Sequence, residues 1–159
     1  MENLYIIYLD DQREVLSTLS KDLSLFESLF QVEECESAEE AYSLMEEIDE
    51  QGDYVVVLIS DHIMPGKNGV DFLSEVNNDM RFVSTKKILL TGMATHKDTI
   101  LAINNARIDK YIEKPWSTEM LVNMVKELVT RFVFEKGLDY QKYIKLLDQK
   151  VMFEVLRRM

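Results

Sequence analysis

The feature that most limits the fold of this chain is an alternation between two hydrophobic patterns. Short, continuous apolar runs alternate with longer segments in which apolar residues recur every three or four positions. Continuous runs are typical of strands covered on both faces, and the longer period is typical of amphipathic helices. The alternation therefore predicts a βα repeat, with helices on both faces of one parallel sheet.

Five strands are expected from this pattern. The clear apolar runs are LYIIYL at 4–9, YVVVLIS at 54–60 and KKILLT at 86–91, and weaker strand candidates lie at 31–35 and 110–113. Helical stripes fill the intervals, the fourth helix beginning at Thr95, and Ser37 and Ser117 are expected to cap two of the helices. Five βα units within the first 134 residues predict an α/β fold, a doubly wound three-layer sandwich.

The chain continues beyond what five units require. Gly137 is a plausible helix C-cap, so we expect one domain at 1–136 and a helical extension at 137–159. The extension carries another apolar stripe, which predicts one further helix. It could fold back on the domain, pair with a second copy, or lead into an output domain. The stripe consists of Tyr140, Ile144, Leu147, Val151 and Val155.

Composition excludes several classes of protein. The 29 acidic and 18 basic residues give a net charge of −11, which argues against direct nucleic-acid binding by this chain. The N-terminus lacks a basic region followed by a long apolar run, and the longest apolar stretch, 54–59, is too short to span a bilayer. Cys35 is the only cysteine. A cytoplasmic protein without membrane contact is expected.

Polar residues stand at the ends of the expected strands. Asp10 and Asp11 follow the first strand, Asp61 follows the third, Thr91 ends the fourth and Lys114 follows the fifth. Because ligands of doubly wound sheets bind at the carboxyl ends of the strands, we expect these side chains to meet at one edge. This convergence would explain why a strongly apolar run ends on an aspartate.

Three converging carboxylates raise one another's pKa unless a cation neutralises them. Mg²⁺ fits, because it prefers carboxylate and phosphate oxygens, and the absence of His or Cys in the set argues against zinc. In such a site Asp61 can act as a nucleophile toward a phosphoryl group, and Lys114 and Thr91 can stabilise the charge on the transferring oxygens.

Each residue also has a simpler interpretation. Asp11 could cap the first helix, Thr91 could belong to a turn, and Lys114 could be a solvated lysine. Trp116 is expected to anchor the loop after Lys114, although it could instead serve a partner surface. The occurrence of the polar groups at the ends of four separate strands favours a shared site.

The motifs taken together resemble the receiver domains of two-component response regulators, the CheY-like superfamily with a flavodoxin-like fold. The resemblance covers about residues 3–134, and the intervals of 50, 30 and 23 residues that separate Asp11, Asp61, Thr91 and Lys114 are usual for that family. The matching positions are Asp10-Asp11, Asp61, MPG with Gly69 behind it, Thr91 in ILLTG, and YIEKP with Tyr111 and Lys114.

The resemblance implies a chemical role for each site residue. Asp61 would accept a phosphoryl group from a histidine kinase or a phosphotransfer protein, and Lys114 would pair with it. Mg²⁺ would be held by Asp10, Asp11, Asp61 and the backbone carbonyl of Ile63. A receiver of this kind catalyses only its own phosphorylation and dephosphorylation, so it is not an enzyme acting on an external substrate.

The resemblance also implies a conformational switch. Thr91 would move toward the phosphoryl group and Tyr111 would rotate inward, which changes the face formed by the fourth helix, the fifth strand and the fifth helix. Ile63 and Met93 are apolar residues two positions beyond Asp61 and Thr91. We hypothesise that they restrict the attacking water and slow self-dephosphorylation, and a phosphoryl lifetime of seconds would contradict this.

Two other functions stay open from sequence. One is a phosphatase or phosphotransferase similar to haloacid dehalogenases, but these need a second acid two residues after the nucleophile, where this chain has Ile63. The other is an interaction module that works without phosphorylation. The expected downstream partner is another protein or a C-terminal output domain, in which case the chain is an excised receiver, and a homodimer through the extension is possible.

Overall fold

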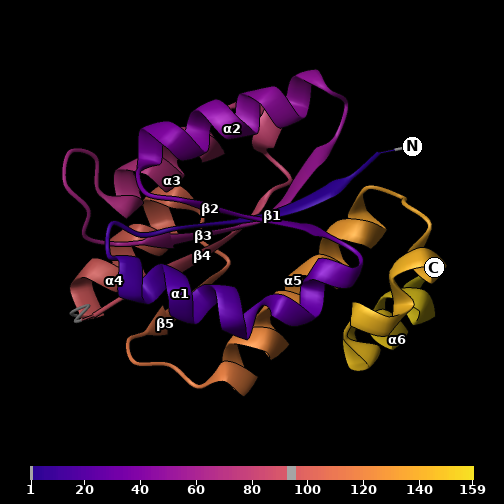
Figure 1. Ribbon diagram of the computed structural model, residues 1–159. Coiled ribbons are helices and arrows are strands. Elements are labelled where there is room, and N and C mark those ends of the chain that lie inside the picture. The colour runs from indigo at the N-terminus through magenta and orange to yellow at the C-terminus, as the bar shows by residue number, and fades with distance from the viewer. Residues whose placement is uncertain (1, 93–95) are drawn as a thin grey trace.

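The computed structural model describes residues 2–92 and 96–159. Its strands are β1 (Leu4–Leu9), β2 (Gln31–Cys35), β3 (Tyr54–Asp61), β4 (Lys86–Thr91) and β5 (Lys110–Glu113). They form one parallel sheet in the order β2-β1-β3-β4-β5 (Figure 1), which confirms the predicted doubly wound fold. The third strand is one residue longer than predicted, because the backbone pairing with β4 continues through Asp61.

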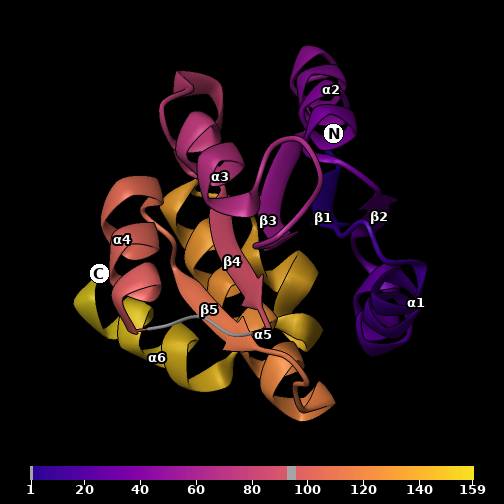
Figure 2. The same ribbon diagram turned by 90° about the vertical axis from the view of Figure 1, so that its left-hand side faces the viewer.

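Helices cover both faces of this sheet. The α-helices are α1 (Arg13–Asp22), α2 (Ala38–Glu50), α3 (Gly69–Asn77), α4 (His96–Ala106), α5 (Thr118–Glu135) and α6 (Gln149–Arg158). Three 3₁₀ segments are η1 (Ser24–Ser28), η2 (Met80–Phe82) and η3 (Tyr140–Leu146). Figures 1 and 2 show α2 and α3 on one face and α1 and α5 on the other. Thr95, where the fourth helix was expected to begin, lies outside the described residues.

The sheet separates two apolar cores. Ile88 and Leu90 of β4 belong to the core beneath α1 and α5, whereas Leu89, between them, belongs to the core beneath α2 and α3. Successive side chains of a strand point to opposite faces, so a continuous apolar run supplies both cores at once. Full burial of each such side chain contributes about 1.5–3 kcal/mol, and both layers are thereby held against the sheet.

The predicted caps are present. The side chains of Ser37 and Ser117 accept hydrogen bonds from the backbone N–H groups of Glu40 and Met120. The first helical stripe of the sequence, which runs from Leu16 to Phe26, is divided between two elements: α1 ends at Asp22, and η1 continues the buried side through Phe26. The 3₁₀ turns of η1 tighten the chain before β2 without exposing the stripe.

Gly137 ends α5 as a Schellman motif. It has a φ of +66°, its N–H donates to the carbonyl of Phe134, and the N–H of Leu138 donates to the carbonyl of Val133 at 3.0 Å. Only glycine adopts this backbone conformation at little cost, which explains why the helix ends here. The placement of a domain boundary at this residue stays a prediction.

The extension folds back on α5 and contains the predicted further helix as α6, which a 3₁₀ segment precedes. It forms η3 and α6, separated by Asp148, whose side chain caps α6 by accepting from the N–H of Val151. The backbone N–H of Asp148 donates to the Thr130 hydroxyl at 2.8 Å, and the ring of Tyr143 stacks on Phe30. The change from three to 3.6 residues per turn shifts the buried side, so Ile144 of the predicted stripe is exposed.

None of the helices in the described part of the chain combines the length and the hydropathy that crossing a bilayer requires.

Candidate functional site

An ammonium group joins two buried carboxylates at the carboxyl edge of the sheet. Lys114 Nζ donates to Asp10 Oδ2 at 3.0 Å and to Asp61 Oδ1 at 2.7 Å. Asp10 is fully buried and Asp61 is 5% exposed, so neither carboxylate can rely on water for its stabilisation. The three residues come from the ends of β1, β3 and β5, as the sequence predicts for this edge.

Asp11 completes an acidic group that could hold a metal ion. Asp10, Asp11 and Asp61 each offer one carboxylate oxygen, and these oxygens all lie within 4.8 Å of one another. Asp11 is exposed, whereas Asp10 and Asp61 are buried, so the acidic group reaches the surface through Asp11. The set contains only oxygen donors and carries more negative charge than Lys114 can neutralise, which fits Mg²⁺.

Burial and charge act in opposite directions on the paired groups. Burial raises the pKa of Asp61, and the hydrogen bond from Lys114 lowers it. The nearby charge of Asp10 raises it further, so the pKa of Asp61 is raised overall. Burial by itself would lower the pKa of Lys114, but hydrogen bonds from its ammonium to Asp61 and Asp10 reverse the direction, and the pKa is raised. The lysine is therefore held in its charged form beside Asp61.

The loop after β1 directs the Asp10 side chain inward. Asp10 Oδ1 accepts from the backbone N–H of Gln12 at 2.8 Å, which closes a short turn before α1. The N-cap of α1 is Gln12 rather than Asp11, and the Gln12 side chain makes no capping hydrogen bond. The simpler interpretation of Asp11 as a helix cap is therefore wrong, and its carboxylate is left for the acidic group.

Gly69 packs directly against the backbone of Asp61. A Cβ atom at this position would overlap the Asp61 carbonyl oxygen and lie 2.9 Å from its carbonyl carbon. The Gly69 N–H also donates to the carbonyl of His62 at 2.8 Å. The close approach requires glycine, because any side chain would displace the end of β3. Gly69 thus fixes the backbone that carries the Asp61 carboxylate.

The other predicted site residues surround this edge, and their roles stay predictions. Thr91 is buried at the end of β4, and its backbone carbonyl accepts from the N–H of Lys114 at 2.8 Å. Tyr111 on β5 and Ile63 after β3 are 42% and 75% exposed, so both side chains face outward. Met93 lies outside the described residues.

Two loop contacts connect the site to α1. Trp116, two residues after Lys114, donates through Nε1 to Asp22 Oδ2 at 2.8 Å, and the Thr118 hydroxyl donates to Asp22 Oδ1 at 2.9 Å. This agrees with the expectation that Trp116 anchors its loop. Sequence reasoning missed Asp22. The available signal was its charge, because an aspartate is unfavourable as the last residue of a helix.

The fold and the site define the class. The carboxylates and the lysine lie at the carboxyl edge of a doubly wound parallel sheet where the strand order reverses, next to β1 and β3, which is the usual place for the ligand site of such sheets. The family model for the response regulator receiver domain matches residues 6–126. The chain belongs to this family, and the resemblance seen in the sequence is confirmed.

Curated relatives share this region. The hydrogenase transcriptional regulatory protein HoxA of Cupriavidus necator is 32% identical over 124 residues, which cover 78% of this chain and 24% of HoxA. The transcriptional regulatory protein CpxR of Escherichia coli is 30% identical over 126 residues, 79% of this chain and 49% of CpxR. The chain thus spans a quarter to a half of the length of these relatives.

Solved structures show the same fold. The signal receiver domain of an HD domain-containing protein from Pseudomonas fluorescens superposes with a TM-score of 0.73 at 25% identity, covering 86% of this chain and 94% of that one. A CheY-like receiver domain protein from Methanospirillum hungatei gives a TM-score of 0.71 at 23% identity, covering 84% and 99%. The second similarity supports the architecture alone.

Proposed function

We propose that this protein is a phosphorylation-activated signalling switch that accepts a phosphoryl group on Asp61 from a histidine kinase or a phosphotransfer protein. The observation that carries the proposal is the ammonium of Lys114 held between buried Asp61 and Asp10, with an Asp11 oxygen within 4.8 Å of theirs. Family membership supports the same conclusion.

The chemistry is a single displacement at phosphorus. A carboxylate oxygen of Asp61 attacks the phosphoryl group, an O–P bond forms, and the P–N bond to the donor imidazole breaks with its electron pair leaving on nitrogen, which then takes up a proton. Lys114 stabilises the charge on the equatorial oxygens, and the Thr91 hydroxyl is the second donor. Asp10, Asp11, Asp61 and the Ile63 carbonyl would hold Mg²⁺, which when bound supplies divalent positive charge beside the phosphoryl oxygens.

The switch uses residues that connect the site to a distant surface. Lys114 binds Asp61 through its side chain and Thr91 through its backbone, so a new dianion on Asp61 acts on the ends of β4 and β5 together. Thr91 moves toward the phosphoryl group, and the exposed ring of Tyr111 turns inward to occupy the space. The face formed by α4, β5 and α5 then changes its shape and its affinity for a partner.

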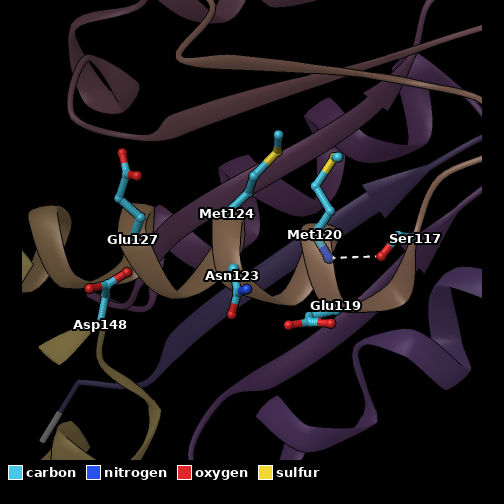
Figure 3. Close-up of a pocket in the computed structure, with 7 residues that line it drawn as sticks. All are labelled: Ser117, Glu119, Met120, Asn123, Met124, Glu127 and Asp148. Atoms are coloured by element: carbon cyan, nitrogen blue, oxygen red, sulfur yellow. Dashed lines mark hydrogen bonds between the residues drawn. The ribbon is translucent and has the colours of Figure 1, made fainter. Parts of the chain in front are cut away.

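The C-terminal extension borders this face. Figure 3 shows the residues that line a pocket along α5, among them Met120 and Met124 of this helix and Asp148 of the extension. Glu127, in the same pocket, accepts from Lys110 of β5 at 3.0 Å. A downstream protein or an output domain that docks on α5 therefore also meets the extension. The net charge of −11 makes a protein partner more favourable than direct DNA contact.

Labelling by acetyl phosphate and Mg²⁺ tests the proposal. Intact-mass measurement should show one phosphoryl group per chain in the parent protein and none in Asp61→Asn. Asp49→Asn, which changes an exposed aspartate of α2 in the same way, should label like the parent protein. An unlabelled parent protein would instead support an interaction module that works without phosphorylation.

Turnover separates the switch from a phosphohydrolase. A switch is labelled once per chain and then releases phosphate slowly, whereas a phosphohydrolase similar to haloacid dehalogenases consumes donor continuously. The position that would carry the second acid of such an enzyme is Ile63, whose side chain is exposed and uncharged. Continuous phosphate release at a rate that exceeds the decay of labelled protein would contradict the switch.

A further inference from the structure

We propose that Asp22 is a positioning residue for Lys114, which it acts on through the loop between β5 and α5. The inference rests on the proposed function, because its effect appears as a change in phosphoryl transfer to Asp61. It concerns a residue outside the acidic group, at the far end of α1.

Both oxygens of the Asp22 carboxylate accept hydrogen bonds, one from the loop and one from the first residue of α5. Oδ2 accepts from the indole N–H of Trp116 at 2.8 Å, and Oδ1 accepts from the hydroxyl of Thr118 at 2.9 Å. Asp22 and Trp116 are half-buried, and the indole packs against the core beneath α1 and α5. Hydrogen bonds to an ionised acceptor are stronger than neutral ones, so this contact fixes the loop firmly.

The placement of Asp22 is explained by the loop rather than by its own helix. It is the last residue of α1, where the negative end of the helix dipole disfavours a carboxylate. It also lies against Thr118, the first residue of α5, where the positive end of another helix favours one. The unfavourable charge at the end of α1 is thus offset by contacts that all belong to the loop and to the start of α5.

The loop transmits this constraint to Lys114. The Lys114 N–H donates to the carbonyl of Thr91, which holds the residue on the β4 side, and Asp22 holds Trp116 two residues further on. A lysine side chain loses substantial conformational freedom when its ammonium is fixed. Because the backbone of Lys114 is held on both sides, its side chain loses less conformational freedom when Nζ binds the phosphoryl oxygens. Nζ is thereby positioned in advance where those oxygens arrive.

The test compares maximal labelling rates with acetyl phosphate, whose phosphoryl–oxygen bond breaks as acetate leaves with the electron pair and the Asp61 O–P bond forms. We expect Asp22→Ala to lower the maximal rate about tenfold. The Mg²⁺ concentration for half-maximal rate should not change, because the loop carries no carboxylate of the acidic group. Glu27→Ala removes the same charge from an exposed residue of η1 and should leave the rate unaltered.

Two further variants identify the route. In the Lys114→Ala background, Asp22→Ala should cause no further loss of rate. Trp116→Phe keeps most of the ring and removes the N–H donor, so combining it with Asp22→Ala should give less than the product of the two single effects. The chain has one tryptophan, so Asp22→Ala should also shift the emission spectrum of Trp116.

The possible outcomes separate this inference from the proposed function. A parent protein that does not label would overturn the proposed function itself. A labelled parent protein with equal rates in Asp22→Ala and Glu27→Ala would overturn only the role of Asp22. A tenfold loss that persists in the Lys114→Ala background, or a changed Mg²⁺ requirement, would assign Asp22 to general structure and likewise overturn the inference.

Discussion

Gly69→Ala should destabilise the protein and slow phosphoryl transfer together. The added Cβ would overlap the Asp61 carbonyl oxygen and lie 2.9 Å from its carbonyl carbon and 3.1 Å from the His62 Cα. Carbon atoms in contact prefer separations of about 3.5–4.0 Å, so the end of β3 must shift by about 1 Å. Overpacking of this kind costs about 1–3 kcal/mol, and because backbone atoms rather than a flexible side chain must move, we expect a loss of about 2 kcal/mol.

Urea unfolding followed by circular dichroism measures this cost, with an unchanged slope against denaturant as the sign that only stability has changed. At a chain length of 159 residues, about 2 kcal/mol corresponds to a fall in Tm of about 4–8 °C. A 1 Å displacement of the nucleophile should also reduce the labelling rate by up to about 100-fold.

The matched control is Gly92→Ala. A Cβ at Gly92 meets no atom of the described residues within 4 Å, and the backbone there does not require glycine. The free energy of unfolding should therefore stay constant or rise by up to about 1 kcal/mol, because alanine restricts the unfolded chain. Equal unfolding midpoints for the two variants, with unimpaired labelling of Gly69→Ala, would refute the argument that Gly69 fixes Asp61.

Four other variants test separate parts of the structure. Lys114→Met should reduce the labelling rate about 100-fold in a stopped-flow assay, because the ammonium beside the transferring oxygens is lost. Burial lowers the pKa of Lys87, so the charged lysine destabilises the folded state at every pH below its folded pKa. This destabilisation disappears as the pH rises from the folded pKa to the unfolded value of about 10.4, so the free energy of unfolding of the parent protein should increase over that range. Lys87→Met should raise the free energy of unfolding at pH 7 by about 1 kcal/mol and remove most of this increase in urea titrations. Deletion of residues 138–159 uncovers the apolar surface of α5, and calorimetry should show a lower Tm; sedimentation of both forms tests whether the extension also joins two copies. Ile63→Gln should shorten the phosphoryl lifetime several-fold, since a polar side chain can orient the attacking water. An unchanged decay rate would reject the hypothesis that Ile63 restricts that water.

The strands of the sheet could be predicted because each strand segment has a local sequence pattern that indicates a strand. The boundaries of β4 follow from the apolar run at 86–91, and the same holds for β1. The end of β3 was not predictable to the residue, since it depends on the pairing of Asp61 with Leu90, which no local pattern contains. The extension shows the same limit: its stripe is visible, but the break at Asp148 depends on a hydrogen bond to Thr130 of another helix.

The site residues likewise fall into a group that the sequence predicts and a group that it does not. Asp10, Asp61 and Lys114 meet because parallel strands bring their carboxyl ends to one edge, so topology alone places them together. Asp22 and Trp116 are 94 residues apart, and neither belongs to a strand end. Their contact depends on how α1 lies against the start of α5, which a pattern of apolar residues does not specify.

Lys114 connects the acidic group to β4, because its side chain forms hydrogen bonds with the acidic group and its backbone forms one with β4. Its ammonium binds Asp61 at 2.7 Å, its N–H binds Thr91 at 2.8 Å, and its loop is held by Asp22 through Trp116. Under the proposed function, phosphorylation of Asp61 would replace one negative charge by about two on oxygens that extend further from β3. We then expect Lys114 to follow those oxygens while its backbone stays bound to β4, so that the displacement reaches Thr91 and the α4-β5-α5 face. A loop free of Asp22 would let the lysine follow the phosphoryl group alone, and labelling without a change at that face is the behaviour expected when this contact is removed.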